Sequence, residues 1–552
     1  MPHTPRNTAV LPAISRRSFL ASSAAGFAAA TFLLRGEALA AAPDDQVLRI
    51  VIHDVWSDWS PLRGGGRPYR FISVGWAAPL YYDGEGNLHP YVFTKWTPNA
   101  DFTVWTFEID PKAVFSDGSP ITAADVAESW AIAAHPSVKS QRADQVLSTV
   151  QGWAEVSKNG ALAFSGVKVT GDRSLEVTLS QQDPIFALKL ANHIAPIIKA
   201  GTVRDADGNE RSDWWYPENV VHSGPFRLEK TDLGAGSVRF VPNEKFFGPK
   251  PLLEAVEISV VEDPVLATAL LKGGQADAHP TLGTPTLIQD LGADFVSGGP
   301  DLSGEHFWIN LSRKPTDDVK VRQALIQAID RDQLYALTYP DGPAIKADQI
   351  LYGVDGVDPD YVPYPYDPDA ARKALAESSY GSAANLPSLN FVGISQPRYQ
   401  LAAEYIAEQW RQVLGISGVS MKPQSDSYSG PEQQTIQFFR DDAGTGVPDA
   451  VAYLRGAIHS SSSNARNKLG NYANPEIDRL LDEAAVKPLD DPQRIALARQ
   501  AQKLFRDEWA YIPWIYKTKQ KRAMPWAKGF DQNYNGQISQ PWLVHIEGRA
   551  TS

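Results

Sequence analysis

The stretch PLYYDGEGNLHPYVFTKWTPNADFTVWTFEIDPKAVFSDGSPITAADVAESW, residues 79–130, carries the most informative local pattern of this chain. Apolar and polar residues alternate over residues 103–109, which predicts a half-buried strand. Asp117-Gly118 then predicts a tight turn. Thr122-Ala123-Ala124-Asp125 has the spacing of a capping box, so we expect a helix to start there and to continue to about residue 134. Nothing in this pattern requires a catalytic residue.

The same stretch resembles the signature of the extracellular solute-binding proteins, family 5, which are peptide-, nickel- and oligosaccharide-binding receptors of ABC importers. The resemblance rests on the Asp-Gly turn before Pro90, the strand Trp105–Ile109 and the run FSDGSPITAADV from Phe115 to Val126. Further along, the run VRQALIQAIDR from Val321 to Arg331 is nearly letter for letter the family's motif. The resemblance extends from about residue 46 to 545.

This resemblance implies an α/β protein with the two-lobed periplasmic binding protein fold, an extra domain and a cleft that closes about a hinge. Lobe one is expected to be discontinuous, and Tyr511–Tyr516 is expected to return the chain to it. The hinge is expected near residues 280–285 and 505–510. The expected segments are a leader at 1–40, lobe one at 41–83, 200–283 and 506–552, the additional domain at 84–199, and lobe two at 284–505.

Several helix starts can be predicted from local chemistry. Asp263-Pro264 places a capping carboxylate before a proline, which has no N–H to leave unbonded in the first turn. Asn474-Pro475 starts another helix in the same way. Its apolar positions 477, 480, 481 and 484 form one stripe, which predicts the face that this helix buries.

Residues 1–40 have the pattern of a leader peptide. Arg16-Arg17 belongs to a twin-arginine signal, and Ala38-Leu39-Ala40 offers a cleavage site of the small-x-small type. The apolar segment between them, Ala21–Leu34, is too short to span a bilayer. The chain contains no cysteine, so a lipid anchor on an N-terminal cysteine is excluded. The mature protein is expected in the periplasm.

The charge and the composition exclude several classes of partner and site. Removing residues 1–40, which hold four arginines and one glutamate, takes the net charge from −12 to −15. Nucleic acid and anionic membranes require a basic surface, so neither is an expected partner. Without cysteine there are no disulfides, thiolate metal sites or iron–sulfur clusters. The 15 Trp and 20 Tyr are enough to line a ligand cleft as well as a core.

The first ligand-binding candidates follow the predicted first strand, Val47–Ile52. Trp56 and Trp59 lie in the polar and aromatic loop after this strand, and in the family that loop opens onto the ligand cleft. The alternative is that both rings pack over the end of the sheet.

A second candidate segment, residues 437–450, is expected to determine which class of ligand binds. Family members that bind peptides carry a Trp, an acidic residue and then Asp-Pro here, and the first acid pairs with the peptide's α-ammonium. Asp449 matches the second, mostly structural, acid. Gly446 stands where the first acid would be, and Phe438 or Phe439 stands near the place of the Trp. This departure leaves the ligand class open.

Three interpretations of this segment remain. In the first, Asp441 or Asp442 pairs with the ligand's ammonium in place of the missing acid. In the second, Arg440 binds a carboxylate or phosphate through two parallel hydrogen bonds. In the third, the ligand is an oligosaccharide or an opine-like sugar conjugate, which would lie on aromatic rings. The ligand-binding candidates are Trp56, Trp59, Phe439, Arg440, Asp441, Asp442 and Asp449.

An enzyme and a metal receptor are the rival classes. The sequence has no Gly-x-Ser-x-Gly elbow, no His-Glu-x-x-His and no Gly-rich nucleotide motif. Its ten His are dispersed, which disfavours a nickel site unless a chelator carries the metal. A distant carboxylate pair for glycoside hydrolysis stays open. We therefore expect no catalytic residue, no metal site and no cofactor.

The resulting prediction is the substrate-binding receptor of an ABC-type importer. It captures an oligopeptide or a peptide-like solute and delivers it, as a monomer, to the transmembrane permease subunits. Alanine at Trp56, Trp59 or Arg440 is expected to weaken ligand binding and to leave the melting temperature of the free protein nearly unchanged.

Overall fold

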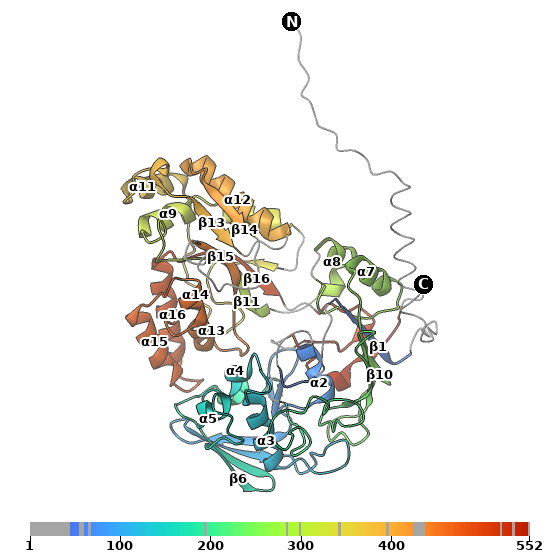
Figure 1. Ribbon diagram of the computed structural model, residues 1–552. Helices are drawn as coiled ribbons and strands as arrows, with labels where there is room; N and C mark the ends of the chain where they lie inside the picture. The colour runs from blue at the N-terminus through green and yellow to red at the C-terminus, as the bar shows by residue number, and fades with distance from the viewer. Residues whose placement is uncertain are drawn as a thin grey trace.

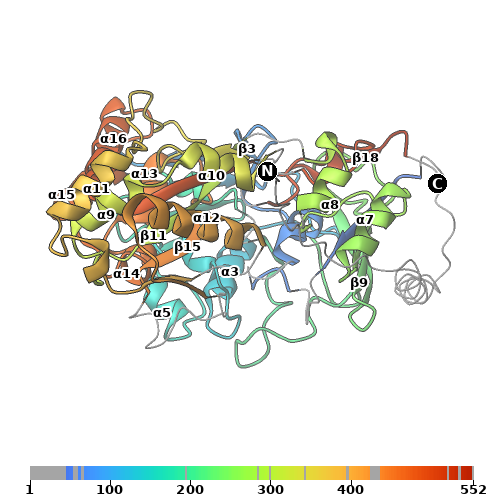
Figure 2. The same cartoon turned by 90° about the horizontal axis from the view of Figure 1, so that it is seen from above.

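The computed structural model describes residues 45–53, 60–63, 68–192, 196–282, 285–296, 300–340, 344–392, 397–422, 436–518, 521–532 and 536–549. These residues form two lobes of mixed α/β structure (Figure 1). Seen from above, the lobe that carries α9 to α16 and the lobe that carries α7 and α8 lie at opposite ends of the molecule (Figure 2). No helix among the described residues combines the length and the apolar character that a membrane crossing requires.

Lobe one is built on a four-stranded sheet with the order β1-β10-β9-β8. The predicted first strand is confirmed as β1, which pairs in parallel with β10. Asp263 caps α7 through the backbone N–H of Val265 and Leu266, as the Asp-Pro pair predicts. The elements of this lobe are β1 (Val47–Ile52), η1 (Pro68–Phe71), α2 (Ile72–Gly75), β2 (Leu80–Tyr82), β3 (Leu88–Pro90), β8 (Phe226–Asp232), β9 (Ser237–Pro242), β10 (Ala255–Val260), α7 (Pro264–Lys272), α8 (Pro285–Asp290), η2 (Ala293–Val296), β17 (Ala527–Lys528), η5 (Pro541–Leu543) and β18 (His545–Ile546).

The segment predicted as the additional domain forms a second four-stranded sheet, β4-β5-β7-β6. In β5 the side chains of Trp105, Phe107 and Ile109 are buried and the residues between them are exposed, which confirms the predicted alternation. Thr122 and Asp125 form the predicted capping box at the start of α3. The elements are β4 (Phe93–Pro98), β5 (Val104–Ile109), α3 (Ala123–Ala134), α4 (Ala143–Leu147), α5 (Trp153–Ser157), β6 (Val167–Gly171), β7 (Ser174–Thr178) and α6 (Phe186–Lys189).

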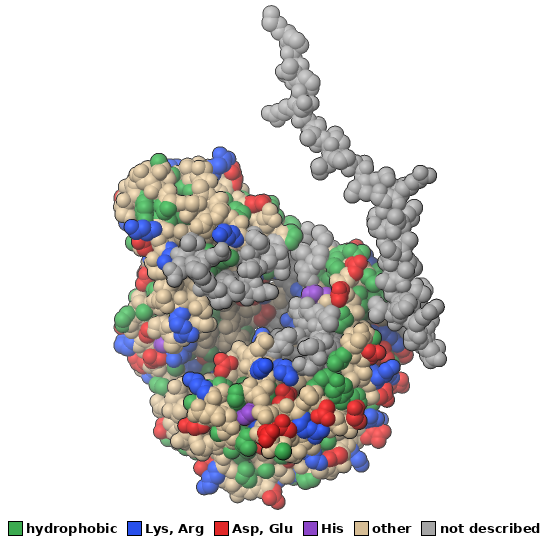
Figure 3. Space-filling model, in the orientation of Figure 1, with side chains coloured by type: hydrophobic (Ala, Val, Ile, Leu, Met, Phe, Trp, Pro, Cys, Tyr) green, Lys and Arg blue, Asp and Glu red, His purple; other side chains and the backbone are tan. Residues whose placement is uncertain are grey.

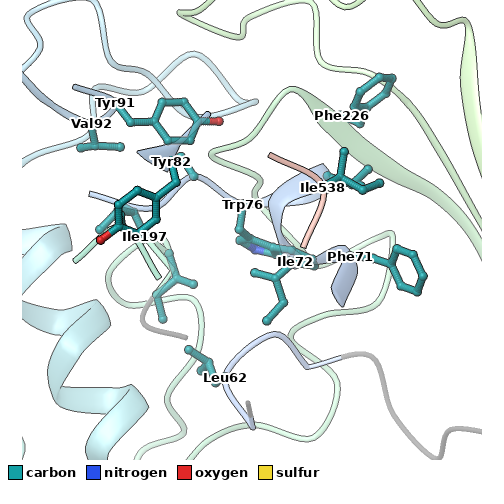
Figure 4. Close-up of a cluster of buried hydrophobic side chains, with 14 of the residues drawn as sticks. Leu62, Phe71, Ile72, Trp76, Tyr82, Tyr91, Val92, Ile197, Phe226 and Ile538 are labelled. Carbon is teal, nitrogen blue, oxygen red and sulfur yellow. The ribbon is translucent and has the colours of Figure 1, made fainter. Parts of the chain in front are cut away.

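This second sheet shares one hydrophobic core with lobe one. A single cluster of buried side chains contains Ile50 and Val256 from the lobe-one sheet as well as Trp105 and Trp130 from the other. Figure 4 shows part of this cluster, where residues from both segments surround Trp76. The additional segment is therefore an extension of lobe one and not a separately packed unit.

Lobe two contains a six-stranded sheet with the order β12-β16-β11-β15-β13-β14. Trp410 of α12 packs on Phe391 and Phe438 at one face, and Phe505 of α16 stacks on Tyr511 at the other. The elements are β11 (Pro300–Ile309), α9 (Val319–Gln327), α10 (Arg331–Thr338), β12 (Ala344–Lys346), α11 (Pro368–Glu377), η3 (Ala383–Asn385), β13 (Leu389–Val392), α12 (Pro397–Leu414), β14 (Val419–Lys422), β15 (Phe438–Gly444), α13 (Ala450–Ile458), α14 (Ser463–Asn467), α15 (Pro475–Ala485), α16 (Pro492–Asp507) and β16 (Tyr511–Thr518).

The predicted boundaries between the lobes are corrected at both places where the chain passes from one lobe to the other, by β16 at one and by α8 and η2 at the other. The strand β16, predicted to lie in lobe one, pairs with β11 and β12 in the lobe-two sheet. Residues 285–296, predicted to lie in lobe two, contribute Ile288 and Phe295 to the lobe-one core. An apolar strand that is buried on both faces has the same pattern in either lobe, so its sequence does not show which sheet contains it. The other predicted bounds stay predictions.

Candidate functional site

The candidate segment around β15 lies in the middle of the lobe-two sheet, beside β11. In the antiparallel register, Glu305 of β11 stands opposite Asp442 of β15, and Phe307 stands opposite Arg440. Directly opposed residues share a face of the sheet, so Glu305, Arg440 and Asp442 point the same way. The N-terminal end of α12, with Arg398 and Tyr399, lies on that face.

Glu305 is the centre of this group, because three basic side chains surround its buried carboxylate. Arg440 Nη2 lies 3.1 Å from Oε2, Arg398 Nη2 lies 3.3 Å from Oε1, and Lys517 Nζ lies 3.7 Å from Oε1. The side chain of Glu305 is only 1% exposed. A buried carboxylate needs such partners, since leaving it unpaired costs several kcal/mol.

Arg440 is held on two sides at once. Its guanidinium lies over the ring of Tyr399, with Cζ 3.5 Å from the ring centroid, in addition to the ion pair with Glu305. Burial by itself would lower the pKa of Arg440, but Glu305 and Asp442 outweigh it and raise the pKa. The side chain is 8% exposed, so Arg440 is mainly an internal partner in this conformation.

Asp442 and Lys517 form the accessible part of the group. The two side chains are ion-paired and remain 41% and 30% exposed, respectively. Burial alone would raise the pKa of Asp442, but Lys517 and Arg440 outweigh it and hold the pKa at about 2. Burial would lower the pKa of Lys517, whereas Asp442 and Glu305 raise it. Both groups are therefore charged at neutral pH. We call Glu305, Arg398, Arg440, Asp442 and Lys517 the lobe-two charge cluster.

Several buried polar atoms in and beside this cluster make no hydrogen bond to another described residue. They are the Nε atoms of Arg398 and Arg440, the hydroxyl of Tyr339, Glu305 Oε2 and Asp442 Oδ1. The two acceptors still lie within ion-pair distance of Arg440, at 3.1 and 3.7 Å. Buried polar groups normally have partners, so this concentration indicates a place where a polar group binds.

The cluster lies at the end of the sheet that faces lobe one. The strands β11 and β16 are the first and last of lobe two, and Pro300 stands opposite Thr518 where the chain enters and leaves it. Figure 1 shows these strands on the side of lobe two that faces lobe one. Figure 3 shows that the molecular surface is hollowed between the lobes.

The other predicted site residues are distributed differently. Asp441 is ion-paired with Lys468. Phe439 is fully buried in the lobe-two core and is not available to line a cleft. Asp449 caps α13 through the N–H of Ala452 and forms a buried ion pair with Arg494. Phe439 and Asp449 therefore have packing and structural roles instead of a place on the accessible surface. Trp56 and Trp59 lie outside the described residues.

Sequence inspection missed three members of the cluster, namely Glu305, Arg398 and Lys517. Arg398 and Lys517 stand near the end of an element whose remaining residues are mostly apolar or helix-forming, and such positions are commonly charged because they reach solvent. Glu305 lies inside β11, among both polar and apolar residues. A charged residue at the end of an otherwise buried strand, as with Lys517 after Tyr511–Tyr516, is the only signal that the sequence offered. Among the described residues, no group of three or more His, Asp or Glu side chains is arranged to hold a metal ion.

Comparison with protein families gives a match over most of the chain. Residues 87–465 match the model of the bacterial extracellular solute-binding proteins, family 5 (middle region). The periplasmic oligopeptide-binding protein OppA of Salmonella typhimurium is 26% identical over 465 residues, which cover 82% of this chain and 83% of OppA. The probable deoxycholate-binding periplasmic protein YgiS of Escherichia coli is 24% identical over 476 residues, which cover 82% of this chain and 84% of YgiS.

Solved structures confirm the two-lobed fold. The periplasmic murein tripeptide-binding protein MppA, in its unliganded open form, superposes with a TM-score of 0.74 at 22% sequence identity. The superposition covers 91% of this chain and 97% of the MppA chain. The family and these relatives are binding proteins by name.

Proposed function

Because the chain belongs to the bacterial extracellular solute-binding proteins of family 5, we propose that it is the substrate-binding receptor of an ABC-type importer for an oligopeptide or a peptide-like solute. OppA and MppA are peptide-binding proteins by name. The ligand is enclosed when the two lobes close about the hinge. Closure shifts the population towards the form that docks on the permease, and no chemistry is performed on the ligand.

The observation that carries this proposal is the lobe-two charge cluster. It combines two arginines and a lysine at the end of the sheet that faces lobe one. An arginine fork matches the geometry of a carboxylate, and every peptide with a free C-terminus ends in one. Lys517 is accessible from the surface, so a ligand carboxylate can reach the cluster without unfolding the sheet.

The cellular context of the proposal rests on residues 1–40 and on the relatives. The twin-arginine pattern at Arg16-Arg17 supports export of the folded protein. OppA and YgiS are periplasmic by name. We place the mature protein in the periplasm as a monomer, without a cofactor, with the transmembrane permease subunits as its partners.

A thermal-shift screen of residues 41–552 tests the receptor function. The screen compares pools of di- to pentapeptides with oligosaccharides and a nickel–histidine chelate. A ligand at one hundred times its dissociation constant adds about 2.7 kcal/mol of stability. We expect the peptide pools to raise the melting temperature. A rise with oligosaccharides alone, or with the nickel chelate alone, would contradict the peptide assignment.

A matched pair of arginine variants tests the place of binding. Arg398→Ala removes a member of the cluster, whereas Arg372→Ala removes an exposed arginine of α11. Each variant is compared with its own unliganded form, so that a loss of intrinsic stability does not count as a loss of binding. We expect R398A to lose most of the ligand-induced shift and R372A to retain it. Equal shifts in both variants would place the ligand elsewhere.

A further inference from the structure

We propose that the lobe-two charge cluster accepts a ligand group with a single negative charge and no ammonium beside it, and that Glu305 sets this limit. This inference rests on the proposed function. It narrows the ligand class to peptides or peptide-like solutes that have one free carboxylate and a blocked amino group, such as N-acylated peptides.

The charge balance of the cluster favours a ligand group with one negative charge. Arg398, Arg440 and Lys517 contribute three positive charges within 4 Å of Glu305. Glu305 and Asp442 contribute two negative charges, so one positive charge remains. A ligand with one carboxylate completes the balance. A ligand group with two negative charges exceeds it, because Glu305 already occupies the position that a second anion would need.

The acidic residues of the candidate segment disfavour a ligand ammonium group. Residues 437–450 contain three acids, and each is paired with a cation of the protein. Asp441 pairs with Lys468, Asp442 with Lys517, and Asp449 with Arg494. An ammonium group placed beside this segment would therefore meet carboxylates that are already neutralised and a cluster that is net positive.

The buried donors that lack a partner favour an acceptor-rich ligand group. The Nε atoms of Arg398 and Arg440 are buried donors, and no other described residue accepts from them. Arginine cannot accept a hydrogen bond. The hydroxyl of Tyr339 is buried beside Arg398 and likewise makes no hydrogen bond to another described residue. Glu305 Oε2 and Asp442 Oδ1 also lack a hydrogen bond, but Arg440 Nη2 lies within ion-pair distance of both, at 3.1 and 3.7 Å. The two donors and the hydroxyl have no such partner among the described residues, so they favour a group rich in acceptors, which a carboxylate is and an ammonium is not.

End-group chemistry tests the proposal directly. One random pentapeptide pool is prepared in four forms: both ends free, N-acetylated with a free carboxylate, C-amidated with a free amine, and blocked at both ends. Native mass spectrometry then measures how much of each form residues 41–552 capture. We expect at least tenfold more capture from the acetylated pool with a free carboxylate than from either amidated pool. We also expect it to exceed the pool with both ends free.

The outcomes separate this inference from the proposed function. Capture that is equal across the four pools, or strongest with a free amine, would overturn the inference and leave the peptide receptor intact. If no peptide pool is captured at all, the proposed peptide function fails and the inference fails with it. A preference for the free carboxylate with indifference to the amine would overturn the exclusion of the ammonium group.

Glu305→Gln tests the limit on charge, since it keeps the shape of the side chain and removes its charge. Glu476→Gln on the exposed face of α15 is the matched control. The probes are N-acetylated pools ending in Ala, with one carboxylate, or in Asp, with two. We expect the wild type and E476Q to capture the Ala pool at least tenfold better than the Asp pool. We expect E305Q to lose most of this discrimination, and unchanged discrimination in folded E305Q would overturn the role of Glu305.

A second variant keeps the proposal testable if E305Q does not fold. Lys517→Gln reduces the excess positive charge to zero at a partly exposed position. We expect K517Q to lose its preference for a free carboxylate over an amide. Retention of that preference in K517Q would show that the charge balance of the cluster does not select the ligand.

Discussion

Arg440 of β15 reaches diagonally across to Glu305 of β11, and Nη2 lies 3.1 Å from Oε2 in a site where both side chains are at least nine-tenths buried. This pair joins two central strands of lobe two at the end that faces lobe one. Its burial revises one expectation drawn from the sequence, namely that Arg440 contributes to ligand binding alone.

Arg440→Ala is expected to destabilise the free protein as well as to weaken binding. The substitution leaves Glu305 buried with fewer cations and removes the guanidinium from the ring of Tyr399. Breaking a buried pair in this way costs about 3–5 kcal/mol, and Arg398 and Lys517 offset part of it. Chemical denaturation of the ligand-free variant measures the loss. A midpoint equal to that of the wild type would restore the sequence-based expectation.

The ion pair between Asp449 and Arg494 is expected to matter for stability and not for ligand contact. Two N–H groups of Arg494 lie 2.9 and 3.1 Å from the carboxylate, and both side chains are buried. Arg494→Ala should lower the free energy of unfolding by about 3–5 kcal/mol. Arg479→Ala, which removes an exposed pair on α15, should cost less than about 1 kcal/mol. Similar midpoints for the two variants would contradict a structural role for the buried pair.

The protein is expected to lose stability in acid because two histidines are buried in the neutral form. Burial lowers the pKa of His222 and of His306 to about 3, below the ordinary value of about 6.5 in the unfolded chain. The unfolded state then binds more protons between these two pKa values, so stability falls as the pH drops below about 6.5. At pH 4.5 each histidine costs on the order of 3 kcal/mol.

His306→Phe isolates one of these contributions. His306 packs against Trp308 and Tyr511, and neither ring nitrogen bonds to another described residue. The unfolding free energy of the variant should therefore fall less steeply between pH 6 and pH 4. The slope of unfolding free energy against pH should decrease by about the amount that the binding of one proton contributes. An unchanged slope would mean that His306 is protonated in the folded state. His222 is the less suitable target, because its ring bonds Gly75 and Leu228.

Asp277 is expected to stabilise the packing of the C-terminal segment on lobe one. Its buried carboxylate accepts from Arg549 at 2.9 Å, from the indole of Trp526 at 2.8 Å and from the backbone of Arg49 at 2.7 Å. Asp277→Ala should cost about 3 kcal/mol or more, because Arg549 is left buried without its main partner. Arg549→Met should cost a similar amount. If the double variant loses the sum of both single losses, the two residues do not interact as described.

Local sequence determined the elements whose formation depends on neighbouring residues. The stripe at Ile477, Leu480, Leu481 and Ala484 is the buried face of α15, and the Asp263-Pro264 pair starts α7. The alternation in residues 103–109 appears in β5 with its apolar side chains inside. These features are fixed within a few residues, by caps, by helical periodicity and by the two faces of a strand. The family and its two-lobed fold also followed from the motifs.

Only the tertiary structure decided which sheet each strand joins and which charges meet. The strand Tyr511–Thr518 is apolar along most of its length, and its place between β11 and β12 depends on pairing with residues about 170 to 220 positions away. Glu305, Arg398, Arg440 and Lys517 come from four elements and converge only through the sheet register and the packing of α12. Their spacing in the sequence carries no trace of this convergence, because long-range pairing sets register and strand order.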